Sequence, residues 1–189
     1  MTRGTLITFV TAVLMLVGAQ AEARTCKGDA SGWGVASVEI DSDMNGILGS
    51  SGYSEGTDKC LGRFTASNAG EIADWDGVSY CDFDEYGTPS GATLFYLSIS
   101  QVVRYRSGDL VFLELDDSRP SWYCYHWADP NTSTYEVNSV ITGGTGRLEG
   151  ISGRSSGTGR SYGLQNMSAS SGIFVSEVDL PDRPKKQDD

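Results

Sequence analysis

The chain of 189 residues is poor in histidine, proline and basic side chains. The single histidine, His126, excludes His-rich metal sites and any relay of two imidazoles. Only 14 Lys and Arg residues stand against 25 Asp and Glu residues, which gives a formal net charge of −11. Such a chain lacks the basic face that is needed to follow a nucleic-acid backbone, so nucleic acid is not an expected partner.

Long hydrophobic runs are also scarce, and the one at the N-terminus is typical of a secretory signal. Arg3 supplies a positive start, an apolar run covers Leu6–Val17, and Ala21 and Ala23 end small-x-small cleavage sites. This run is short for a permanent membrane anchor, which is the alternative interpretation. Residues 1–23 are therefore expected to be a signal peptide, and the mature chain to be secreted or periplasmic without a membrane partner.

The four cysteines all lie in the expected mature chain, at Cys26, Cys60, Cys81 and Cys124. An even count in an exported protein predicts two disulfides, and no Cys-x-x-Cys pair indicates a redox or zinc site. Four cysteines allow three pairings. We favour Cys60–Cys81 with Cys26–Cys124, because Cys60 and Cys81 flank one short segment and could lie on neighbouring strands.

Glycine is in excess, with 24 residues, while windows of helical periodicity are missing. Short β-type segments recur instead, separated by Gly, Asp, Asn and Ser, so most glycines are expected in turns. The expected strands cover residues 33–40, 61–66, 77–83, 92–103, 110–115, 122–127, 135–142, 155–162 and 173–178. This spacing predicts one all-β domain over residues 24–180, an antiparallel barrel or a sandwich. The charged, Pro-containing residues 181–189 are expected to form a disordered tail.

The densest glycine stretch, Ile141–Gly159, does not fit a phosphate-binding loop. Gly144 and Gly146 are followed by Gly150, one residue too late for G-x-G-x-x-G, and no helix pattern follows. No nucleotide cofactor is therefore expected. A glycine-lined bend between strands is the structural interpretation.

The same stretch resembles the signature of the allene oxide cyclase and dirigent-like β-barrels. The matching residues are Val140–Gly153 and Gly157–Gly159, with Leu148 where that superfamily usually has Phe. A weaker likeness to its secreted bacterial members covers Lys59–Gly62 and Tyr80–Cys81. The resemblance implies an antiparallel barrel of about eight strands that holds a small apolar molecule and is often a homo-oligomer in plants. It places no catalytic residue on this chain.

Aromatic residues gather at 122–127. Alternation places Trp122, Cys124 and His126 on one face of a strand, and Tyr123, Tyr125 and Trp127 on the other. One face could line a ligand cavity, although simple core packing explains aromatic clusters as well. The candidate cavity-lining residues are Trp122, Tyr123, Tyr125, His126 and Trp127.

Two acidic patterns are weaker candidates. Asp41, Asp43 and Asn45 match the first half of a calcium loop, but Gly52 stands where the bidentate Glu belongs, and a hairpin turn explains Asn45 and Gly46 without a metal. We expect no bound metal. Acid pairs that could suggest glycosidase chemistry also fit a solvated surface; they are Glu71, Asp74 and Asp76, then Glu114, Asp116 and Asp117.

The sequence therefore predicts a secreted, disulfide-stabilised β-barrel without catalysis of its own and without a cofactor. Its expected role is to bind a small apolar or aromatic ligand or to act as an extracytoplasmic interaction module. The alternative is a cyclase or isomerase that acts on an apolar substrate inside the barrel. That alternative needs a buried acid or a polar group that positions water in the cavity.

Overall fold

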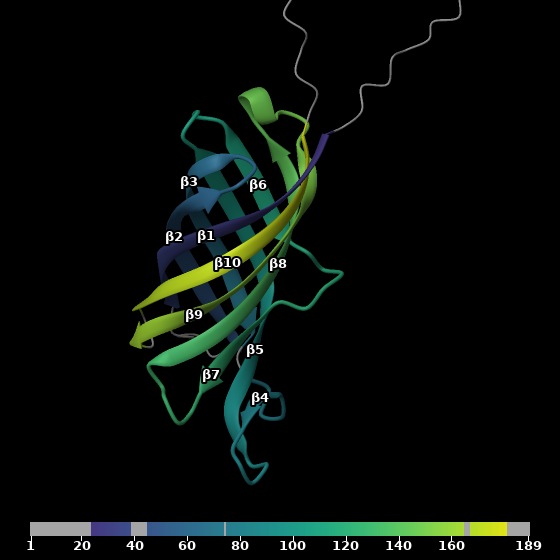
Figure 1. Ribbon diagram of the computed structural model, residues 1–189. Coiled ribbons are helices and arrows are strands. Elements are labelled where there is room, and N and C mark those ends of the chain that lie inside the picture. Colours follow the sequence, from purple (N-terminus) through teal and green to yellow (C-terminus); the bar gives the residue numbers. More distant parts are fainter. Residues whose placement is uncertain (1–23, 39–44, 74, 165–166, 181–189) are drawn as a thin grey trace, which may run out of the picture.

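The computed structural model describes residues 24–38, 45–73, 75–164 and 167–180 of the chain. Strands make up almost all of this part, and one 3-10 turn, η1 (Gly146–Leu148), is its single helical element (Figure 1). No helix in these ranges is long and apolar enough to cross a membrane. The strands are β1 (Arg24–Val38), β2 (Ile47–Asp58), β3 (Gly62–Ala73), β4 (Tyr80–Phe83), β5 (Pro89–Tyr105), β6 (Leu110–Leu115), β7 (Trp122–His126), β8 (Thr132–Gly144), β9 (Ser152–Leu164) and β10 (Met167–Leu180).

The strands form a closed antiparallel barrel. Neighbouring strands pair in the order β3-β2-β1-β10-β9-β8-β6-β5, and β3 pairs with β5 to close the ring. β7 lies between β5 and β8, in line with β6, so β6 and β7 share one barrel position. The ring therefore has eight strand positions, which confirms the expected all-β barrel.

β4 extends the sheet beyond the barrel. It pairs with the first residues of β5, on the side of β5 that β3 occupies further along. In Figure 1, β4 and the start of β5 project from the lower end of the molecule, opposite the end that carries η1.

A row of four glycines crosses the inner wall of the barrel on four adjacent strands. Gly159 pairs with Gly172, Gly172 with Gly32, and Gly32 with Gly56. Aromatic residues continue the row at both ends, because Tyr135 is opposite Gly159 and Phe64 is opposite Gly56. The part of the inner wall formed by these four glycines has no side chains, and the rings of Tyr135 and Phe64 lie on either side of it.

The rings fill the space that these glycines leave. A Cβ on Gly172 would lie 2.6 Å from the Tyr135 hydroxyl, and a Cβ on Gly56 would lie 2.8 Å from the ring of Phe64. One row further along, a Cβ on Gly157 would overlap the ring of Phe174. Protein interiors are close-packed, so any side chain here would displace a ring. The glycines are therefore a packing requirement of the interior.

The aliphatic core fills the half of the barrel near η1. The buried residues there include Val103, Val111, Leu113 and Val178, and Leu148 and Ile151 cover them from the β8–β9 connection. Burying each such side chain stabilises the fold by about 1.5–3 kcal/mol. The opposite half of the interior is lined by tyrosines and small polar residues, and it is described below.

Two disulfides join the strands, but not in the expected pairing. Cys26 bonds to Cys60, and Cys81 bonds to Cys124. The expected Cys60–Cys81 bond is wrong because Cys60 precedes β3 and Cys81 follows it. The 12 residues of β3 span roughly 40 Å at about 3.3 Å per residue. A disulfide needs Cα atoms within about 7 Å.

The strand prediction also missed part of the sheet. β2 was not expected, because its sequence is rich in glycine and serine and resembles a turn region. Nine of the described glycines do have a positive φ, among them those of the turns at Gly46, Gly62 and Gly108. Others, including the glycine row, lie inside strands, so the expectation that glycines concentrate in turns is only partly right.

The expected signal peptide, residues 1–23, and tail, residues 181–189, lie outside the described residues.

The contact between Gly172 and Tyr135 can be tested by a double-mutant cycle. Gly172→Ala should lower the free energy of unfolding by about 1–3 kcal/mol, since the new methyl group overlaps the Tyr135 hydroxyl. Tyr135→Phe removes that oxygen and should recover most of the loss in the double variant. Urea unfolding of the four proteins measures the coupling. Additive effects of the two substitutions would contradict this packing.

Candidate functional site: the lower chamber of the barrel

The interior away from η1 contains a cavity of about 130 Å³, here called the lower chamber. Its wall combines apolar groups, tyrosine rings, amides and serines. The lining residues that matter for the argument are Phe64, Asn68, Ile72, Tyr96, Ile99, Gln101, Tyr123, Tyr135, Val137, Ser161, Ser170 and Phe174. An engineered apolar cavity of about 150 Å³ binds benzene, so the chamber has the size of a one-ring ligand.

A second cavity of about 70 Å³, the upper chamber, lies within the aliphatic core. Four residues, Ser54, Phe64, Gln101 and Phe174, line both chambers. They therefore form the partition between them.

Three tyrosines bring their rings to the lower chamber, and two of their hydroxyls have hydrogen-bond partners. The Tyr123 hydroxyl bonds with the Ser133 hydroxyl, and the Tyr135 hydroxyl donates to the Ser171 carbonyl at 3.5 Å. Tyr96 lies on β5 and lines the same chamber. No described residue hydrogen-bonds its hydroxyl. Among the described residues, the Tyr96 hydroxyl is thus open to a hydrogen bond with a ligand in the chamber.

Burial raises the pKa of Tyr96, and the neighbouring hydroxyls of Tyr123 and Tyr135 add to the rise. Burial also raises the pKa values of Tyr123 and Tyr135. The three phenols therefore keep their protons at neutral pH. They can donate hydrogen bonds, and they bring no charge into the chamber.

No Asp or Glu is among the described residues that line the lower chamber. A buried carboxylate does line the upper chamber: this is Asp58, which is 6% exposed. Its Oδ1 accepts hydrogen bonds from the backbone N–H groups of Cys60 and Leu61, and its Oδ2 accepts one from Ser176 at 3.3 Å. Asp58 thus closes the β2–β3 turn, and its oxygens are already engaged.

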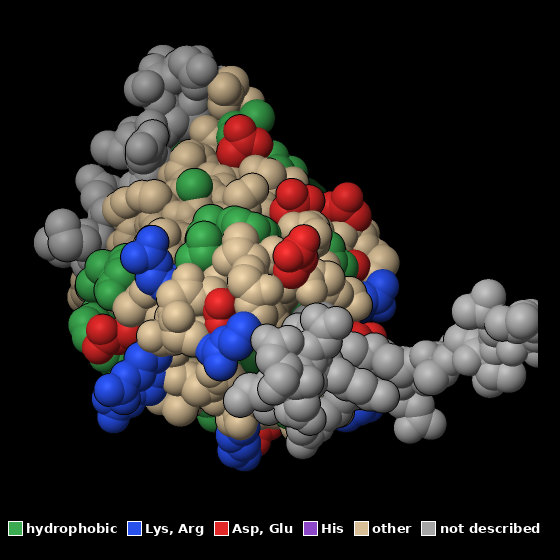
Figure 2. All heavy atoms as spheres, turned by 90° about the horizontal axis from the view of Figure 1, so that it is seen from above, with side chains coloured by type: hydrophobic (Ala, Val, Ile, Leu, Met, Phe, Trp, Pro, Cys, Tyr) green, Lys and Arg blue, Asp and Glu red, His purple; other side chains and the backbone are tan. Residues whose placement is uncertain are grey.

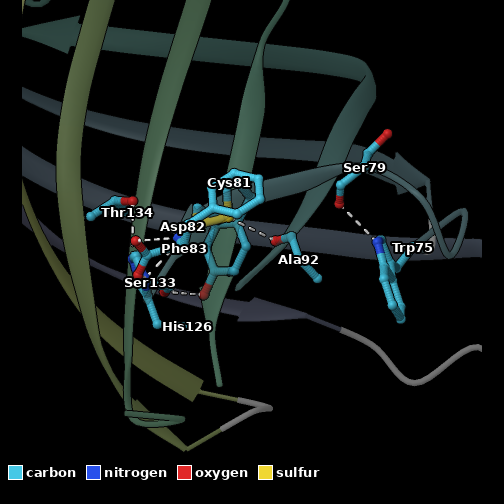
Figure 3. Close-up of a disulfide and its surroundings, with 11 residues drawn as sticks. Trp75, Ser79, Cys81, Asp82, Phe83, Ala92, His126, Ser133 and Thr134 are labelled. Carbon is cyan, nitrogen blue, oxygen red and sulfur yellow. Dashed lines mark hydrogen bonds and ion pairs between the residues drawn. A yellow bond between two sulfur atoms is a disulfide. The ribbon is translucent and has the colours of Figure 1, made fainter. Parts of the chain in front are cut away.

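The aromatic segment 122–127 contributes one of its five candidates to the chamber. Tyr123 lines it, whereas Trp122 lies on the outer face and lines a surface groove there. His126 also lies on the outer side, where its Nδ1 is 3.0 Å from Asp82 and its Nε2 is 3.3 Å from Thr134 (Figure 3). Alternation along the strand predicted this division, but it did not predict which face points inward.

Trp127 belongs to an aromatic cluster at the lower end of the molecule. Its ring packs edge-to-face with Trp75 and Tyr80, at centroid distances of 5.6 and 6.0 Å. The Cys81–Cys124 disulfide and the Asp82–His126 pair hold β4 against β7 beside this cluster (Figure 3). Tyr125 is half-buried on β7, opposite Ser133 of β8.

Asp76 and Asp116 are the acidic candidates for which the described residues show a structural role. Asp76 accepts hydrogen bonds from the N–H groups of Val78 and Ser79 and from the Ser79 hydroxyl, which closes a turn. Asp41, Asp43 and Asp74 lie outside the described residues. Within the described ranges, no group of three or more His, Cys, Asp or Glu residues is placed to hold a metal ion.

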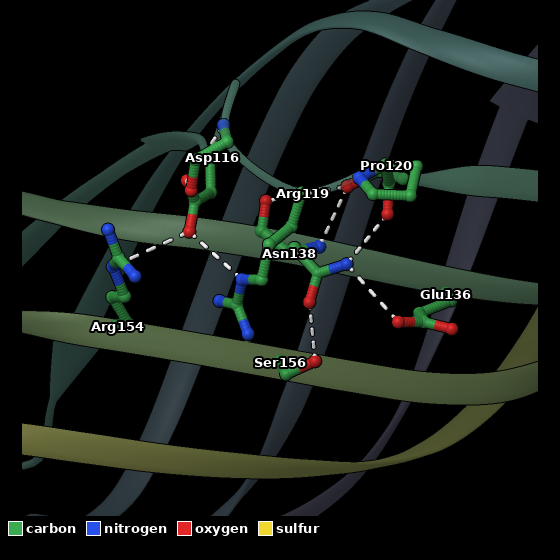
Figure 4. A network of polar contacts seen from close by, with 9 residues as sticks. Asp116, Arg119, Pro120, Glu136, Asn138, Arg154 and Ser156 are labelled. Carbon is green, nitrogen blue, oxygen red and sulfur yellow. Dashed lines mark hydrogen bonds and ion pairs between the residues drawn. The ribbon is translucent and has the colours of Figure 1, made fainter.

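Asp116 is the centre of a polar network on the outside of the barrel (Figure 4). It is 3% exposed, and its Oδ2 lies 3.0 Å from Arg119 Nε and 3.5 Å from Arg154 Nε. Ser118 hydrogen-bonds Oδ1 through its hydroxyl and its N–H. The Ser118 hydroxyl is the largest cause that lowers the pKa of Asp116, with the two guanidinium groups contributing. The contacts of Asp116 therefore stabilise the β6–β7 connection, and they do not indicate a reaction site.

Comparison with known proteins adds one structural likeness. No family model and no curated protein matches the chain. Among solved structures, a pterocarpan synthase dirigent protein aligns with 86% of this chain and 90% of its own, at 7% identity and a TM-score of 0.33. So low a score carries no argument, and the barrel assignment stands on the strand pairing alone.

The network around Asp116 predicts a pH-dependent stability difference. Asp116→Asn should lower the melting temperature at pH 7 by on the order of a few degrees, since it removes the anion that the guanidinium groups bind. A carboxyl whose pKa is lowered by folding stabilises the protein above its unfolded value of 3.8, and this contribution is lost as the pH falls through the folded value. The gap between the two proteins should therefore close in acid. Thermal unfolding followed by circular dichroism tests this, and a gap that persists at acid pH would contradict it.

Proposed function

We propose that this protein is an exported β-barrel that binds a small aromatic ligand in its lower chamber and catalyses no reaction on it. The observation that carries the proposal is the chamber itself, where the Tyr96 hydroxyl has no hydrogen-bond partner among the described residues and lies in a wall of apolar side chains, tyrosines, serines and amides. The expected signal peptide and the two disulfides support an oxidising compartment. The resemblance to the allene oxide cyclase and dirigent-like barrels supports an internal ligand.

Size and polarity define the ligand class. A volume of about 130 Å³ suits one ring with a small substituent, and ligand pockets are mostly apolar with few convergent polar groups. A tyrosine hydroxyl that has no partner among the described residues matches one polar atom on the ligand. A simple phenol therefore fits better than a fatty acid or a sugar.

The cyclase or isomerase alternative lacks support from the chamber. Such chemistry needs an acid or a base within hydrogen-bond reach of the substrate. The described lining of the lower chamber offers neutral phenols, amides and hydroxyls, and Asp58 is committed to the β2–β3 turn. Binding is the function that these groups favour.

Phenol, toluene and two variants of β5 test the proposal. Phenol should shift the NMR methyl signals of Ile72, Ile99 and Val137, which line the chamber. Ile99→Phe fills the chamber and should abolish this binding. The matched control Val102→Phe makes a similar change on the outer face of β5, where Val102 is 42% exposed, and should leave binding unchanged.

A third variant tests the hydroxyl without changing the size of the chamber. Tyr96→Phe should weaken phenol binding about three- to tenfold, the usual range for one hydrogen bond, and leave toluene binding unchanged. Native-like NMR spectra and unfolding curves establish that each variant folds. Phenol binding that leaves the interior methyl signals unmoved, or that survives Ile99→Phe, would refute an internal site.

A further inference from the structure

The outer face of the barrel carries an open groove of about 960 Å³ across β1, β2, β3 and β5. It opens on the outer face of the wall whose inner side lines the lower chamber, and Gly32, Trp33 and Phe64 line both spaces. Its floor is glycine backbone and its sides carry three arginines, a tryptophan, a glutamate and threonines. The lining residues are Ser31, Gly32, Trp33, Glu55, Gly56, Thr57, Arg63, Phe64, Thr65, Arg104, Tyr105, Arg106 and Gly108.

Strand register brings the three arginines together on one exposed face. Arg104 is opposite Thr65 in the β3–β5 ladder, and the Arg106 N–H donates to the Arg63 carbonyl at 3.0 Å just beyond it. Arg63 and Arg106 thus face each other, and Arg104 follows Arg106 two residues away on the same side. Side chains at such positions lie about 5–8 Å apart at their Cβ atoms.

These arginines have no carboxylate partner among the described residues, in contrast to most other basic side chains. Lys27, Lys59, Arg119, Arg147 and Arg154 each form an ion pair with an Asp or Glu. A chain with 25 acidic residues could have paired the groove arginines as well. Like charges placed directly opposite in a sheet destabilise it, so this arrangement favours a bound anion.

In the view along the barrel onto the end that carries η1, Lys and Arg side chains lie mainly toward the left and the bottom and several Asp and Glu side chains toward the upper right, with both signs present on most sides (Figure 2). The net charge of −11 would repel a long polyanion such as a nucleic acid. A compact anion that contacts only the groove avoids this repulsion.

The groove also offers a flat apolar surface beside the charges. Trp33 is 55% exposed and is opposite Glu55 in the β1–β2 ladder. Glu55 is opposite Thr65, and Thr65 is opposite Arg104, so Trp33 and Arg104 lie at the same level three strands apart. Three arginines and one glutamate leave a local charge of about +2, which matches a dianion better than a single carboxylate. Arginine forks bind phosphate oxygens in pairs, and an indole face stacks on flat rings.

We propose that this groove binds a small phosphate monoester, with the phosphate between Arg63, Arg104 and Arg106 and the ring of the ester against Trp33. The hydroxyls of Thr57 and Thr65 lie on the same face and can donate to the remaining phosphate oxygens. The three arginines of this site do not line the lower chamber, although Trp33 lines both spaces, and the site does not depend on an internal ligand.

NMR titration of the full chain with phenyl phosphate, phenyl sulfate and inorganic phosphate tests the site. Phenyl phosphate should shift the Nε signals of the three arginines and the indole N–H of Trp33 in a saturable way. Phenyl sulfate, a monoanion, should bind more weakly, and inorganic phosphate should move the arginine signals but not the indole. Arg104→Gln or Arg106→Gln should weaken phenyl phosphate binding about tenfold, the usual effect of losing one charged hydrogen bond.

Two control variants distinguish binding in this groove from general attraction to arginine and from binding in the lower chamber. Arg160→Gln removes an exposed arginine that also lacks an ion pair among the described residues. Arg160 lines a neighbouring groove on the side of Trp33 away from the three arginines, so this change should alter binding less than twofold. Ile99→Phe fills the lower chamber and should leave phenyl phosphate binding intact. The proposal is wrong if no saturable shift occurs, if Arg160→Gln weakens binding as much as Arg104→Gln does, or if Ile99→Phe abolishes it.

Discussion

The close approach of glycine backbone to aromatic rings is the constraint on which the interior of this barrel depends. Gly159, Gly172, Gly32 and Gly56 remove side chains from one inner wall at one level of four adjacent strands. The Tyr135 and Phe64 rings then reach across into the vacated space. An eight-stranded barrel has an interior just wide enough for side chains to fill. The glycines on one wall and the aromatic rings on the other therefore depend on each other to fill the interior.

This packing divides the interior into parts with different chemistry. Near η1, aliphatic side chains form the core and leave only the small upper chamber. Away from η1, tyrosines, amides and serines surround a larger space, and one tyrosine hydroxyl there has no partner among the described residues. Charge is also unevenly distributed over the outer wall, since three arginines line one groove of a molecule whose net charge is −11. Binding sites inside and outside the barrel follow from these asymmetries.

Much of the fold could be predicted from the sequence, because strand alternation and turn residues are local signals. β6, β7 and β8 are close to their expected ranges. β2 was missed because glycine and serine inside a curled strand look like a turn. The disulfide pairing depends on which strand ends meet, and that is set by the whole ring. Tyr123 was found as a candidate through its aromatic neighbours, but isolated residues such as Tyr96 and Tyr135 give no local signal of facing one cavity.

The central claim is that the glycine wall and the tyrosines enclose a persistent, largely apolar chamber. Crystallography of the protein under xenon pressure tests it most directly, because xenon enters dry apolar cavities and scatters strongly. We predict xenon density beside Tyr96, Ile99 and Val137, with the strand pairing of the barrel unchanged. A crystal structure with side chains packed through that space and no xenon between them would contradict the account.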